Sequence, residues 1–431
     1  MKIAVCTLGC KTNQFECQAM EKLLAARGFE IVAQDDPADA YIINSCTVTS
    51  TADKKTRQLI RHLKRLHPDA LVAVCGCMVQ TASPSLVRSC GADLLGGNRN
   101  YLEFANAVAQ ALEERTWPAT TIAAESPDFV TLPAGGLHGR TRALLKIEDG
   151  CTNFCTYCII PFARGPIRSL PLEQAIEQTR LLCEQGFREI VLTGIEISAY
   201  GSDLTPHCDL CDLVEQICLA AGTTRISLGS LKPTLIDEAF CQRLSKLENL
   251  CHHFHLSLQS GCTDTLRRMN RHYTAEDVLR SVSLLRTYFD DPNITADIIV
   301  GFPGESDAEF RETLQTLSEC QLGDAHIFPY SIREGTAAAK MSNQVTGDVK
   351  HERCAECTAL CNQLRDQYLD RQIGSVVTVL PEEERNGRLG GYTDRYLYVL
   401  LPNDPSIHRG VPVSVQITEH RDGELFGSLL H

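Results

Sequence analysis

The chain has 431 residues, of which 43% are hydrophobic and 22% are charged, and its formal net charge is −13. These values are typical of a globular protein of two or three domains, and they argue against a uniformly basic nucleic-acid binder, although a local basic face can still bind phosphates. No apolar stretch approaches the roughly 18 residues of a membrane-spanning helix, and the apolar run before Lys11 is too short for a signal peptide, so we expect a cytoplasmic protein with no membrane partner.

Residues 1–115 alternate short apolar strands with amphipathic helices. Three strand candidates each precede a helical pattern: KIAVCTL, AYIINSC and ALVAVCGC. The helices are expected at about 13–27, after Cys46 and near 79–90. This βαβ order predicts a parallel sheet covered by helices. Residues 116–139 lose the periodicity and gather Pro, Gly and Thr, which predicts a linker.

Residues 140–370 resume the alternation of strands and helices. Six strand candidates are each followed by a helical pattern: RALLKIE, EIVLTG, RISLGS, HHFHLSLQS, ITADIIVGF and GDAHIFPYS. Six βα units in one run predict a partial (β/α)6 barrel, whose chemistry belongs at the carboxyl ends of its strands. A long helix is expected at about 347–371.

Residues 371–431 change in character, because short β-rich runs are broken by Gly, Pro and Asn turns. This pattern fits a small antiparallel β-barrel of the OB-like kind. The predicted fold class is therefore α/β, with an N-terminal parallel α/β domain, a central partial barrel and a small C-terminal antiparallel barrel.

The chain contains 21 cysteines, which is many for its length. In a reducing compartment cysteines serve as packed apolar side chains, metal ligands or catalytic groups rather than as disulfides. Most are therefore expected to lie in the core. That interpretation covers Cys6 and Cys75 within strands and Cys17 within a helix. It also covers two groups with metal-like spacing, the Cys208–Cys211 pair and the helical stripe of Cys354, Cys357 and Cys361.

Cys151, Cys155 and Cys158 form a C-x3-C-x2-C loop directly after the strand RALLKIE. Three thiolates on a [4Fe–4S] cluster leave one iron without a protein ligand, and a cofactor with an amine and a carboxylate could chelate it. Three core cysteines or a zinc site are the alternatives. The motif and its position resemble the radical S-adenosylmethionine enzymes.

Four further segments, TGIEISAYG, LGSLKP, SLQSG and VGFPGES, lie where predicted strands end. Each one alone is also an ordinary βα turn, but four at one edge favour a pocket. By the same resemblance we expect this pocket to bind S-adenosylmethionine, with contacts from Gly194, Glu196, Ser230, Gln259, Gly301, Pro303 and Gly304.

Three separate cysteines, Cys10, Cys46 and Cys77, each follow a predicted parallel strand of the N-terminal domain. The carboxyl ends of such strands form the ligand crevice of an open α/β sheet, but the spacing alone is weak evidence for a metal site. Together with the radical S-adenosylmethionine motif and a small C-terminal barrel, the segments LGCKTNQ, NSCTVTS and VCGC resemble the methylthiotransferase family.

The resemblance covers nearly the whole chain and implies two [4Fe–4S] clusters. Cys151, Cys155 and Cys158 would bind the radical cluster, and Cys10, Cys46 and Cys77 an auxiliary cluster that carries the sulfur to be donated. S-adenosylmethionine would be both radical source and methyl donor, and the barrel would be a TRAM domain that contacts RNA. A reductant and a sulfur source, neither identified by the sequence, would also be needed.

The segments LGCKTNQFE, CTVTSTADKKTRQLIR, CTYCIIPFARGPIRS, LRRMNRHYT and DIIVGFPGES resemble the branch that acts on threonylcarbamoyladenosine in tRNA. The resemblance therefore implies methylthiolation of C2 of this base at position 37, in the anticodon loop. A substrate tRNA with isopentenyladenosine and an aspartate of a ribosomal protein are alternatives. So is a non-enzymatic iron–sulfur RNA-binding protein.

Basic side chains suggest where RNA would bind. The helix after Cys46 is rich in lysine and arginine, although a solvated surface also explains it. Two arginines after the cluster loop could equally be structural ion-pair partners. The predicted RNA contacts are Lys54, Lys55, Arg57, Arg61, Arg164, Arg168, Arg385 and Arg395, and the barrel offers Arg388, His408 and Arg409 as further candidates.

Overall fold

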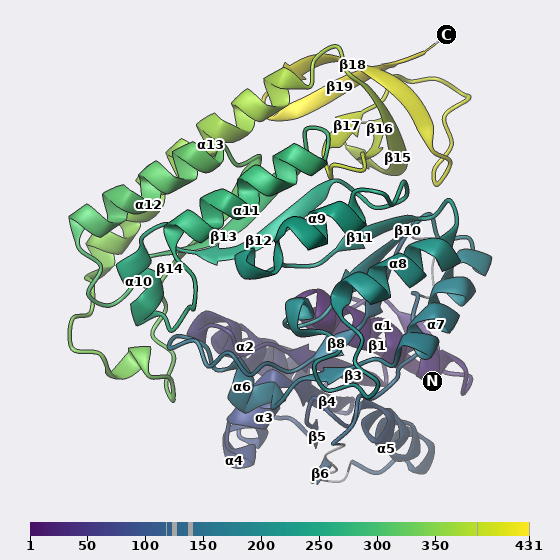
Figure 1. The fold of residues 1–431 in the computed structure, drawn as a ribbon. Helices are drawn as coiled ribbons and strands as arrows, with labels where there is room; N and C mark the ends of the chain where they lie inside the picture. Colours follow the sequence, from purple (N-terminus) through teal and green to yellow (C-terminus); the bar gives the residue numbers. More distant parts are fainter. Residues whose placement is uncertain (118, 123–126, 137–140, 386, 431) are drawn as a thin grey trace.

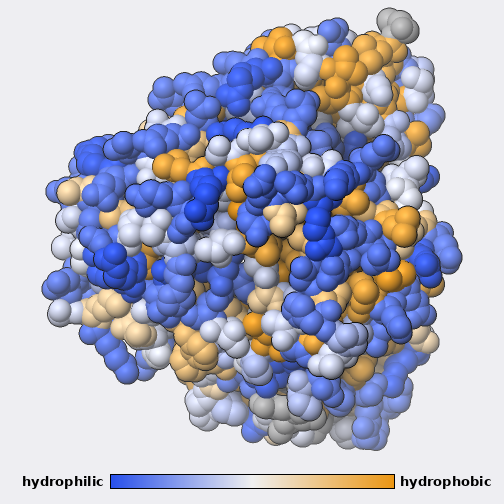
Figure 2. Space-filling model, in the orientation of Figure 1, coloured by the Kyte–Doolittle hydropathy of each residue, from blue (hydrophilic) through white to orange (hydrophobic). Residues whose placement is uncertain are grey.

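The computed structural model describes residues 1–117, 119–122, 127–136, 141–385 and 387–430. An N-terminal sheet domain, a central domain and a C-terminal barrel follow one another along the chain (Figure 1). On the face shown in Figure 2 hydrophobic residues are interspersed with hydrophilic ones, and one group of them lies over the C-terminal barrel. Within the described ranges, no helix is long and apolar enough to cross a membrane.

The N-terminal sheet is parallel throughout, with the strand order β2-β1-β3-β4-β5-β6. Helices α1 and α5 pack on one face of the sheet, and α2, α3 and α4 pack on the other. Strands β3 and β4 are buried on both faces, which explains their continuous apolar sequences. The elements are β1 (Lys2–Leu8), α1 (Lys11–Ala25), β2 (Glu30–Val32), β3 (Ala40–Ser45), α2 (Ser50–Leu66), β4 (Leu71–Gly76), α3 (Cys77–Thr81), α4 (Pro84–Arg88), β5 (Leu94–Gly96), α5 (Tyr101–Glu114) and β6 (Thr120–Ile122).

Two features of this domain differ from the sequence predictions. The single helix expected near 79–90 is two short helices, because Ser83 caps α4 and Pro84 has no N–H with which to continue α3. Strand β6 lies inside the predicted linker and pairs in parallel with β5. Residues 118, 123–126 and 137–140 of that linker lie outside the described residues.

The central domain contains the six predicted parallel strands as two three-stranded sheets, β7-β10-β11 and β12-β13-β14. Two isolated bridges, Ile226 to Leu250 and Leu231 to Leu256, join the halves into an open barrel. The strands are β7 (Arg142–Lys146), β10 (Glu189–Thr193), β11 (Arg225–Leu228), β12 (His253–Gln259), β13 (Asn293–Val300) and β14 (Asp324–Pro329). A short hairpin pairs β8 (Glu148–Asp149) with β9 (Arg168–Ser169).

Helices cover the outside of this open barrel (Figure 1). The long helix α13 occupies the predicted span, Gly347–Arg371, and packs on the edge strand β14. The others are α6 (Ile160–Arg164), α7 (Leu172–Glu184), η1 (Ile197–Ala199), α8 (Leu210–Ala221), η2 (Pro233–Leu235), α9 (Glu238–Leu244), α10 (Thr263–Arg268), α11 (Ala275–Tyr288), α12 (Asp307–Cys320) and η3 (Ala338–Lys340).

The C-terminal segment forms a closed five-stranded barrel in the order β15-β16-β17-β19-β18. The sequence predicted an antiparallel barrel, and the structure differs at one pair: β17 and β19 are parallel, which closes the sheet. The strands are β15 (Val376–Arg385), β16 (Arg388–Tyr392), β17 (Tyr398–Leu400), β18 (Val413–Arg421) and β19 (Glu424–Leu429).

Candidate cluster and cofactor site

Cys151, Cys155 and Cys158 lie on the loop between β8 and α6. Each sulfur accepts a hydrogen bond. Cys151 Sγ accepts the backbone N–H of Asn153 at 3.5 Å, and Cys158 Sγ accepts the backbone N–H of Ile160 at 3.4 Å. Cys155 Sγ accepts from the guanidinium of the buried Arg271, also at 3.5 Å. Such donors favour a negatively charged sulfur, which is the form that binds iron.

Burial acts in the opposite direction on these thiols. It raises the pKa of Cys151 to about 11 and the pKa of Cys158 to about 12. With no cation bound, both thiols keep their protons at neutral pH. Because a metal cluster binds thiolates, loading of this loop must release protons to solution.

The N-terminal triad follows three neighbouring strands. In the sheet, Leu8 of β1 pairs with Ser45 of β3, and Ser45 pairs with Gly76 of β4. Cys46 and Cys77 come directly after their strands, and Cys10 comes two residues after β1. The shared register therefore brings the three cysteines to one edge of the sheet. Burial raises the pKa of Cys77 to about 11, and charge on Cys46 and Cys10 contributes to the rise.

Gly76 allows the chain to turn into the site. Its φ is +93°, and a Cβ at this position would lie 2.3 Å from the Asn44 side chain and 2.6 Å from the Ser45 carbonyl oxygen. A residue with a side chain would be strained at this positive φ and would also clash with Asn44 and Ser45. The glycine therefore sets the path by which β4 delivers Cys77.

The donor set fits iron–sulfur clusters. Within the described part of the chain, no three His, Cys, Asp or Glu side chains converge as the ligands of a single metal ion do. A cubane cluster makes a different demand, because three thiolates bind three different irons and stay farther apart. The chain offers two groups of three thiols, and in one of them, Cys151, Cys155 and Cys158, every sulfur has a hydrogen-bond donor.

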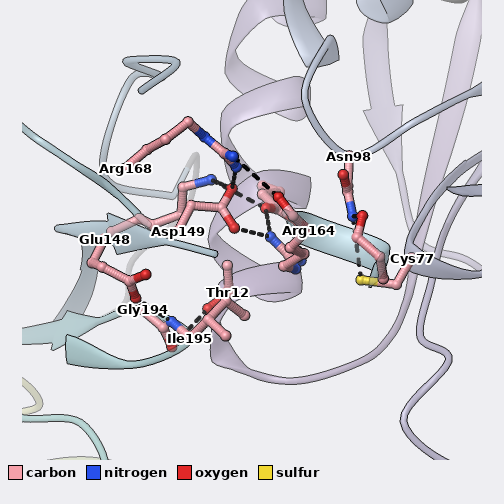
Figure 3. Close-up of polar contacts among 12 residues, drawn as sticks. Thr12, Cys77, Asn98, Glu148, Asp149, Arg164, Arg168, Gly194 and Ile195 are labelled. Carbon is pink, nitrogen blue, oxygen red and sulfur yellow. Dashed lines mark hydrogen bonds and ion pairs between the residues drawn. The ribbon is translucent and has the colours of Figure 1, made fainter. Parts of the chain in front are cut away.

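A buried ion network joins the two cysteine-bearing domains. Figure 3 shows its Asp149, Arg164 and Arg168 members. Arg164 of α6 binds Glu16 of α1 at 2.8 Å and Asp149 of β8 at 3.0 Å. Lys146 of β7 reaches the same two carboxylates at 3.2 and 3.1 Å, and Arg168 pairs with Asp149 at 3.4 Å. All five residues are at least nine-tenths buried. The network fixes the cluster loop against the helix that begins beside Cys10.

This network corrects one prediction. Arg164 is completely buried and Arg168 is 4% exposed, so neither side chain is available to RNA phosphates. Arg168 also donates to the Arg164 carbonyl oxygen at 3.0 Å. Of the two alternatives that the sequence left open, the structure shows structural ion pairing.

A second polar contact connects the same two regions. The Asn98 side chain donates to the Ala163 carbonyl oxygen at 2.8 Å and to the Cys77 sulfur at 3.7 Å (Figure 3). Arg333, which follows β14, pairs with Asp53 of α2 at 2.8 Å. These contacts add N-terminal residues to the surroundings of the cluster loop.

Glu148 organises the turn after β10. Its Oε2 accepts the N–H groups of Ile195 and Glu196 at 2.8 and 2.7 Å, and burial raises the pKa of its carboxyl to about 8. A Cβ at Gly194 would lie 2.7 Å from the same oxygen. The Glu196 carboxylate in turn accepts from the Asn153 side chain of the cluster loop at 2.6 Å. The predicted cofactor residues Gly194 and Glu196 are thus fixed next to the predicted iron ligands.

A cavity of about 570 Å³ brings parts of the predicted sites together. Cys10, Gly194 and Ser230 all line it, as do lumen residues of β12, β13 and β14. The remaining predicted cofactor residues lie outside this lining.

Gln259 has a φ of +67°, and Gly301 and Gly304 have φ of +69° and +78°. A Cβ at Gly301 would lie 2.4 Å from Lys350 of α13, so close packing explains that glycine. Pro303 lies between the two glycines.

The predicted RNA contacts divide into two groups. Lys54, Lys55 and Arg61 are exposed on α2, and Arg57 lines a second cavity of about 800 Å³ beside the cluster loop. In the barrel, Arg385 pairs with Glu383 and stacks on Tyr398.

The structure corrects the prediction that Arg395 contacts RNA. Its guanidinium pairs with Asp290 at 3.2 Å and donates to the Gln372 side chain at 3.0 Å, and the side chain is 15% exposed. It therefore holds the barrel to the central domain instead of facing RNA.

Several site residues were missed by the sequence analysis. Glu16, Lys146 and Asp149 carry the buried network, Arg271 donates to a cluster sulfur, and Glu148 supports the turn after β10. One signal was present for Glu148 and Asp149: two carboxylates stand directly before the cluster loop, where a buried strand is expected.

Family models match three segments of the chain. They are the Radical SAM superfamily over residues 145–317, Uncharacterized protein family UPF0004 over 2–97, and the TRAM domain over 370–430. A solved structure of the radical S-adenosylmethionine methyltransferase TsrM from Kitasatospora setae shares the fold, with a TM-score of 0.56 at 15% identity, over 76% of this chain and 72% of that chain.

Curated relatives match over nearly the full length. Threonylcarbamoyladenosine tRNA methylthiotransferase MtaB of Bacillus subtilis is 37% identical, over 93% of this chain and 90% of the relative. The protein of the same name from Aquifex aeolicus is 35% identical, over 91% and 96%. The tRNA-2-methylthio-N(6)-dimethylallyladenosine synthase of Alkaliphilus oremlandii is 32% identical, over 100% and 93%. The chain therefore belongs to the methylthiotransferase family of radical S-adenosylmethionine enzymes.

Proposed function

We propose that this protein transfers a methylthio group to C2 of N6-threonylcarbamoyladenosine at position 37 of tRNA. One observation carries the proposal: Cys10 of the N-terminal triad and strand-end residues of the central domain line the same cavity. Relatives named for this reaction, at 34–37% identity over at least 91% of the chain, support the choice of substrate.

Two [4Fe–4S] clusters and S-adenosylmethionine belong to the proposal. Cys151, Cys155 and Cys158 hold one cluster, and Cys10, Cys46 and Cys77 hold the other. When bound, these groups supply one-electron chemistry, a sulfur atom and a methyl group, none of which a side chain can supply for an aromatic C–H bond. A reductant and a sulfur source are required as partners.

The protein's own residues position these groups. Backbone N–H groups and Arg271 donate to the sulfurs of the cluster loop. The buried network of Glu16, Asp149 and Arg164 keeps the two cysteine triads at a fixed separation. The cofactor contacts are Gly194, Glu196, Ser230, Gln259, Gly301, Pro303 and Gly304.

The anticodon loop of tRNA is the proposed partner surface. Lys54, Lys55, Arg57 and Arg61 of α2 and Arg385 of the barrel contact its phosphates, because these side chains are the predicted basic contacts that the structure leaves at or near the surface. A tRNA substrate also places the protein in the cytoplasm.

The test is mass spectrometry of nucleosides from bulk tRNA of cells with and without the gene. We expect methylthio-threonylcarbamoyladenosine to disappear without the gene and to return with the wild-type protein. It should not return with Cys46→Ala, whose iron content falls by about half because one of two clusters is lost. Cys90→Ala is the matched control, since Cys90 is a buried core thiol of the same domain.

Other outcomes would redirect the proposal. Loss of methylthio-isopentenyladenosine instead would identify the other tRNA substrate. An unchanged nucleoside profile would contradict a tRNA substrate, and the ribosomal protein would then be examined.

A further inference from the structure

The lumen of the central barrel contains a polar cluster that the iron ligands and cofactor contacts do not use. His253 and His255 alternate along β12, and Thr295 and Asp297 alternate along β13, so these side chains share the inner face of the sheet. His326 of β14 lies in register with Asp297. All of these side chains except Asp297 line the cavity that Cys10 also borders.

Hydrogen bonds hold the inner part of this cluster. His255 Nδ1 lies 2.7 Å from Thr295 Oγ1, and its Nε2 lies 3.2 Å from the Asp297 carboxylate. His253 Nε2 lies 3.0 Å from the same Thr295 oxygen. Each of these side chains therefore has a partner within the protein.

Lys11 and His326, both exposed, have no such partner among the described residues, and neither do the uncharged side chains of Gln14 and Ser230 in the same lining. Lys11, which follows Cys10 directly, lies over the Tyr396 ring at 5.9 Å and has no carboxylate within ion-pair distance among the described residues. The His326 ring centroid lies 5.6 Å from that of His255 and 6.5 Å from that of Phe328, and no hydrogen bond links His326 to the described residues.

Two acidic groups lie near these side chains: Asp324 lines the cavity, and Asp297 is in register with His326. Asp297 is paired with His255, and Asp324 accepts the N–H of Ala325 at 2.8 Å. Lys11 and His326 are thus the two basic side chains of the cavity that are left to meet a ligand. An anionic or hydrogen-bonding group is the complement of such a pair.

We propose that Lys11 and His326 bind the carboxylate of the threonylcarbamoyl group and so select this substrate. The inference rests on the proposed function and deepens it. C2, the reacting carbon, and C6, whose nitrogen carries the substituent, flank N1 of the same six-membered ring. When the substituent is rotated toward N1, a base whose C2 faces the cluster held by Cys10 directs it into the cavity that Cys10 lines.

The pocket draws on all three domains. Lys11 comes from the N-terminal domain, His326 from the central barrel, and Tyr396 from the C-terminal barrel, where its ring stacks on His253 at 5.0 Å. The Lys11 and His326 side chains are exposed in the structure. An apolar dimethylallyl substituent seated against them would displace their water without offering a hydrogen bond in return. A site built to pair a polar substrate group rejects the analogue that lacks it.

The experiment measures binding of three RNA stem–loops to the cluster-loaded protein with S-adenosylmethionine. They share the anticodon-loop sequence, and the target base is threonylcarbamoyladenosine, its uncharged methylamide or isopentenyladenosine. We expect the wild type to bind the acid roughly 10-fold or more tightly than the methylamide, as a charge-assisted contact implies. Lys11→Gln and His326→Asn should each reduce this ratio several-fold, and Lys11→Arg should restore most of it.

Matched controls are Lys2→Gln, at the opposite end of β1, and His351→Asn, on the exposed side of α13. Both should keep the wild-type ratio. Because Lys11 adjoins Cys10, iron content is measured for every variant. His326→Asn, on a different domain from the triad, decides the result if Lys11→Gln loads poorly.

The outcomes separate the two proposals. If the wild type methylthiolates the acid but binds acid and methylamide equally, the carboxylate site is wrong and the proposed function stands. If Lys11→Gln and His326→Asn both keep the wild-type ratio of acid to methylamide affinity, the carboxylate site is likewise wrong and the proposed function stands. If the wild type does not methylthiolate the acid stem–loop at all, the proposed substrate is wrong, and the carboxylate site falls with it.

Discussion

At the scale of single residues, five charged side chains are buried where the N-terminal and central domains meet. Glu16 is fully buried and bound by Arg164, Lys146, Asn44 and the Tyr101 hydroxyl. Burial by itself would raise the pKa of this carboxyl, but Arg164 and Lys146 hold it below its usual value of 4.5. The charged form is therefore stabilised by its partners, and removing it leaves their charges uncompensated.

We expect Glu16→Gln to destabilise the protein by about 3–5 kcal/mol at neutral pH, because it breaks a buried ion-pair network from one side. A carboxyl whose pKa is lower in the folded state adds stability above its unfolded pKa and loses that contribution as the pH falls through the folded pKa. Wild-type stability should therefore decline below about pH 4.5, and less steeply in the variant. Urea unfolding between pH 3 and pH 7 measures both effects.

Glu30→Gln is the control for this prediction. Glu30 is 64% exposed and lies 3.9 Å from Lys2, so its loss should cost less than about 0.5 kcal/mol. Equal costs for the two variants would contradict the role given to the buried network.

The location of single residues could be predicted from the sequence where it depends only on their position relative to a strand. Cys10, Cys46 and Cys77 could be grouped because each follows a strand of one sheet, and the register bears out that placement. Glu16 and Arg164 could not be paired in advance, since 148 residues separate them and only the packing of two domains brings them together.

At the scale of elements, α2 combines a structural face with a basic one. Ile60 and Leu63 are buried against the sheet, whereas Lys54, Lys55 and Arg61 are exposed. The helix begins beside Cys46, with the Thr49 side chain accepting the N–H of Ala52 at 3.1 Å. A basic face at this position is adjacent to the proposed reaction site.

Replacing Lys54, Lys55 and Arg61 together with glutamine should weaken binding of tRNA without changing its base preference. Each lost phosphate contact should lower the slope of log affinity against log salt by about 1. Titrations of fluorescent tRNA across a salt series measure the slope. Lys246→Gln, on an exposed site of the central domain, should leave it unchanged. A triple variant with the wild-type slope would show that α2 is only a solvated surface.

Element boundaries were predictable where a regular hydrophobic pattern continues over many residues. Helix α13 has its expected bounds, and Cys357 and Cys361 lie in the core as the spacing of a packed stripe predicted. The short elements were not predictable in the same way. Strand β6 has three residues, and its identity depends on an edge of β5 that only the folded sheet provides.

At the scale of the whole molecule, the C-terminal barrel is docked on the central domain. Arg225 donates to the Thr378 and Tyr392 carbonyl oxygens at 2.6 and 3.2 Å. Arg142 pairs with Glu382 at 2.8 Å. The sequence predicted a small barrel from its turns, but these partners are more than 150 residues apart, so their pairing could not be predicted.

The docked barrel contributes one wall residue to the cavity that Cys10 lines. Tyr396 lies on the turn between β16 and β17 and lines the cavity through its stacking on His253. If the barrel moves, the ring that underlies Lys11 moves with it. The position of the barrel is thus coupled to the shape of the proposed substrate site.

The double variant Glu382→Gln, Arg395→Ala should loosen the barrel while leaving it folded, because its core of Val379, Val399 and Val415 is untouched. Removing two polar links should raise hydrogen exchange of the docked strand β15 roughly 10-fold or more, with little change in the N-terminal sheet. Hydrogen-exchange mass spectrometry resolves these regions. Arg421→Ala is the control, since the partners of Arg421, Glu419 and the Phe426 ring, both belong to the barrel itself. Equal exchange in β15 for control and double variant would mean that Arg225 and the stacked rings alone hold the barrel in place.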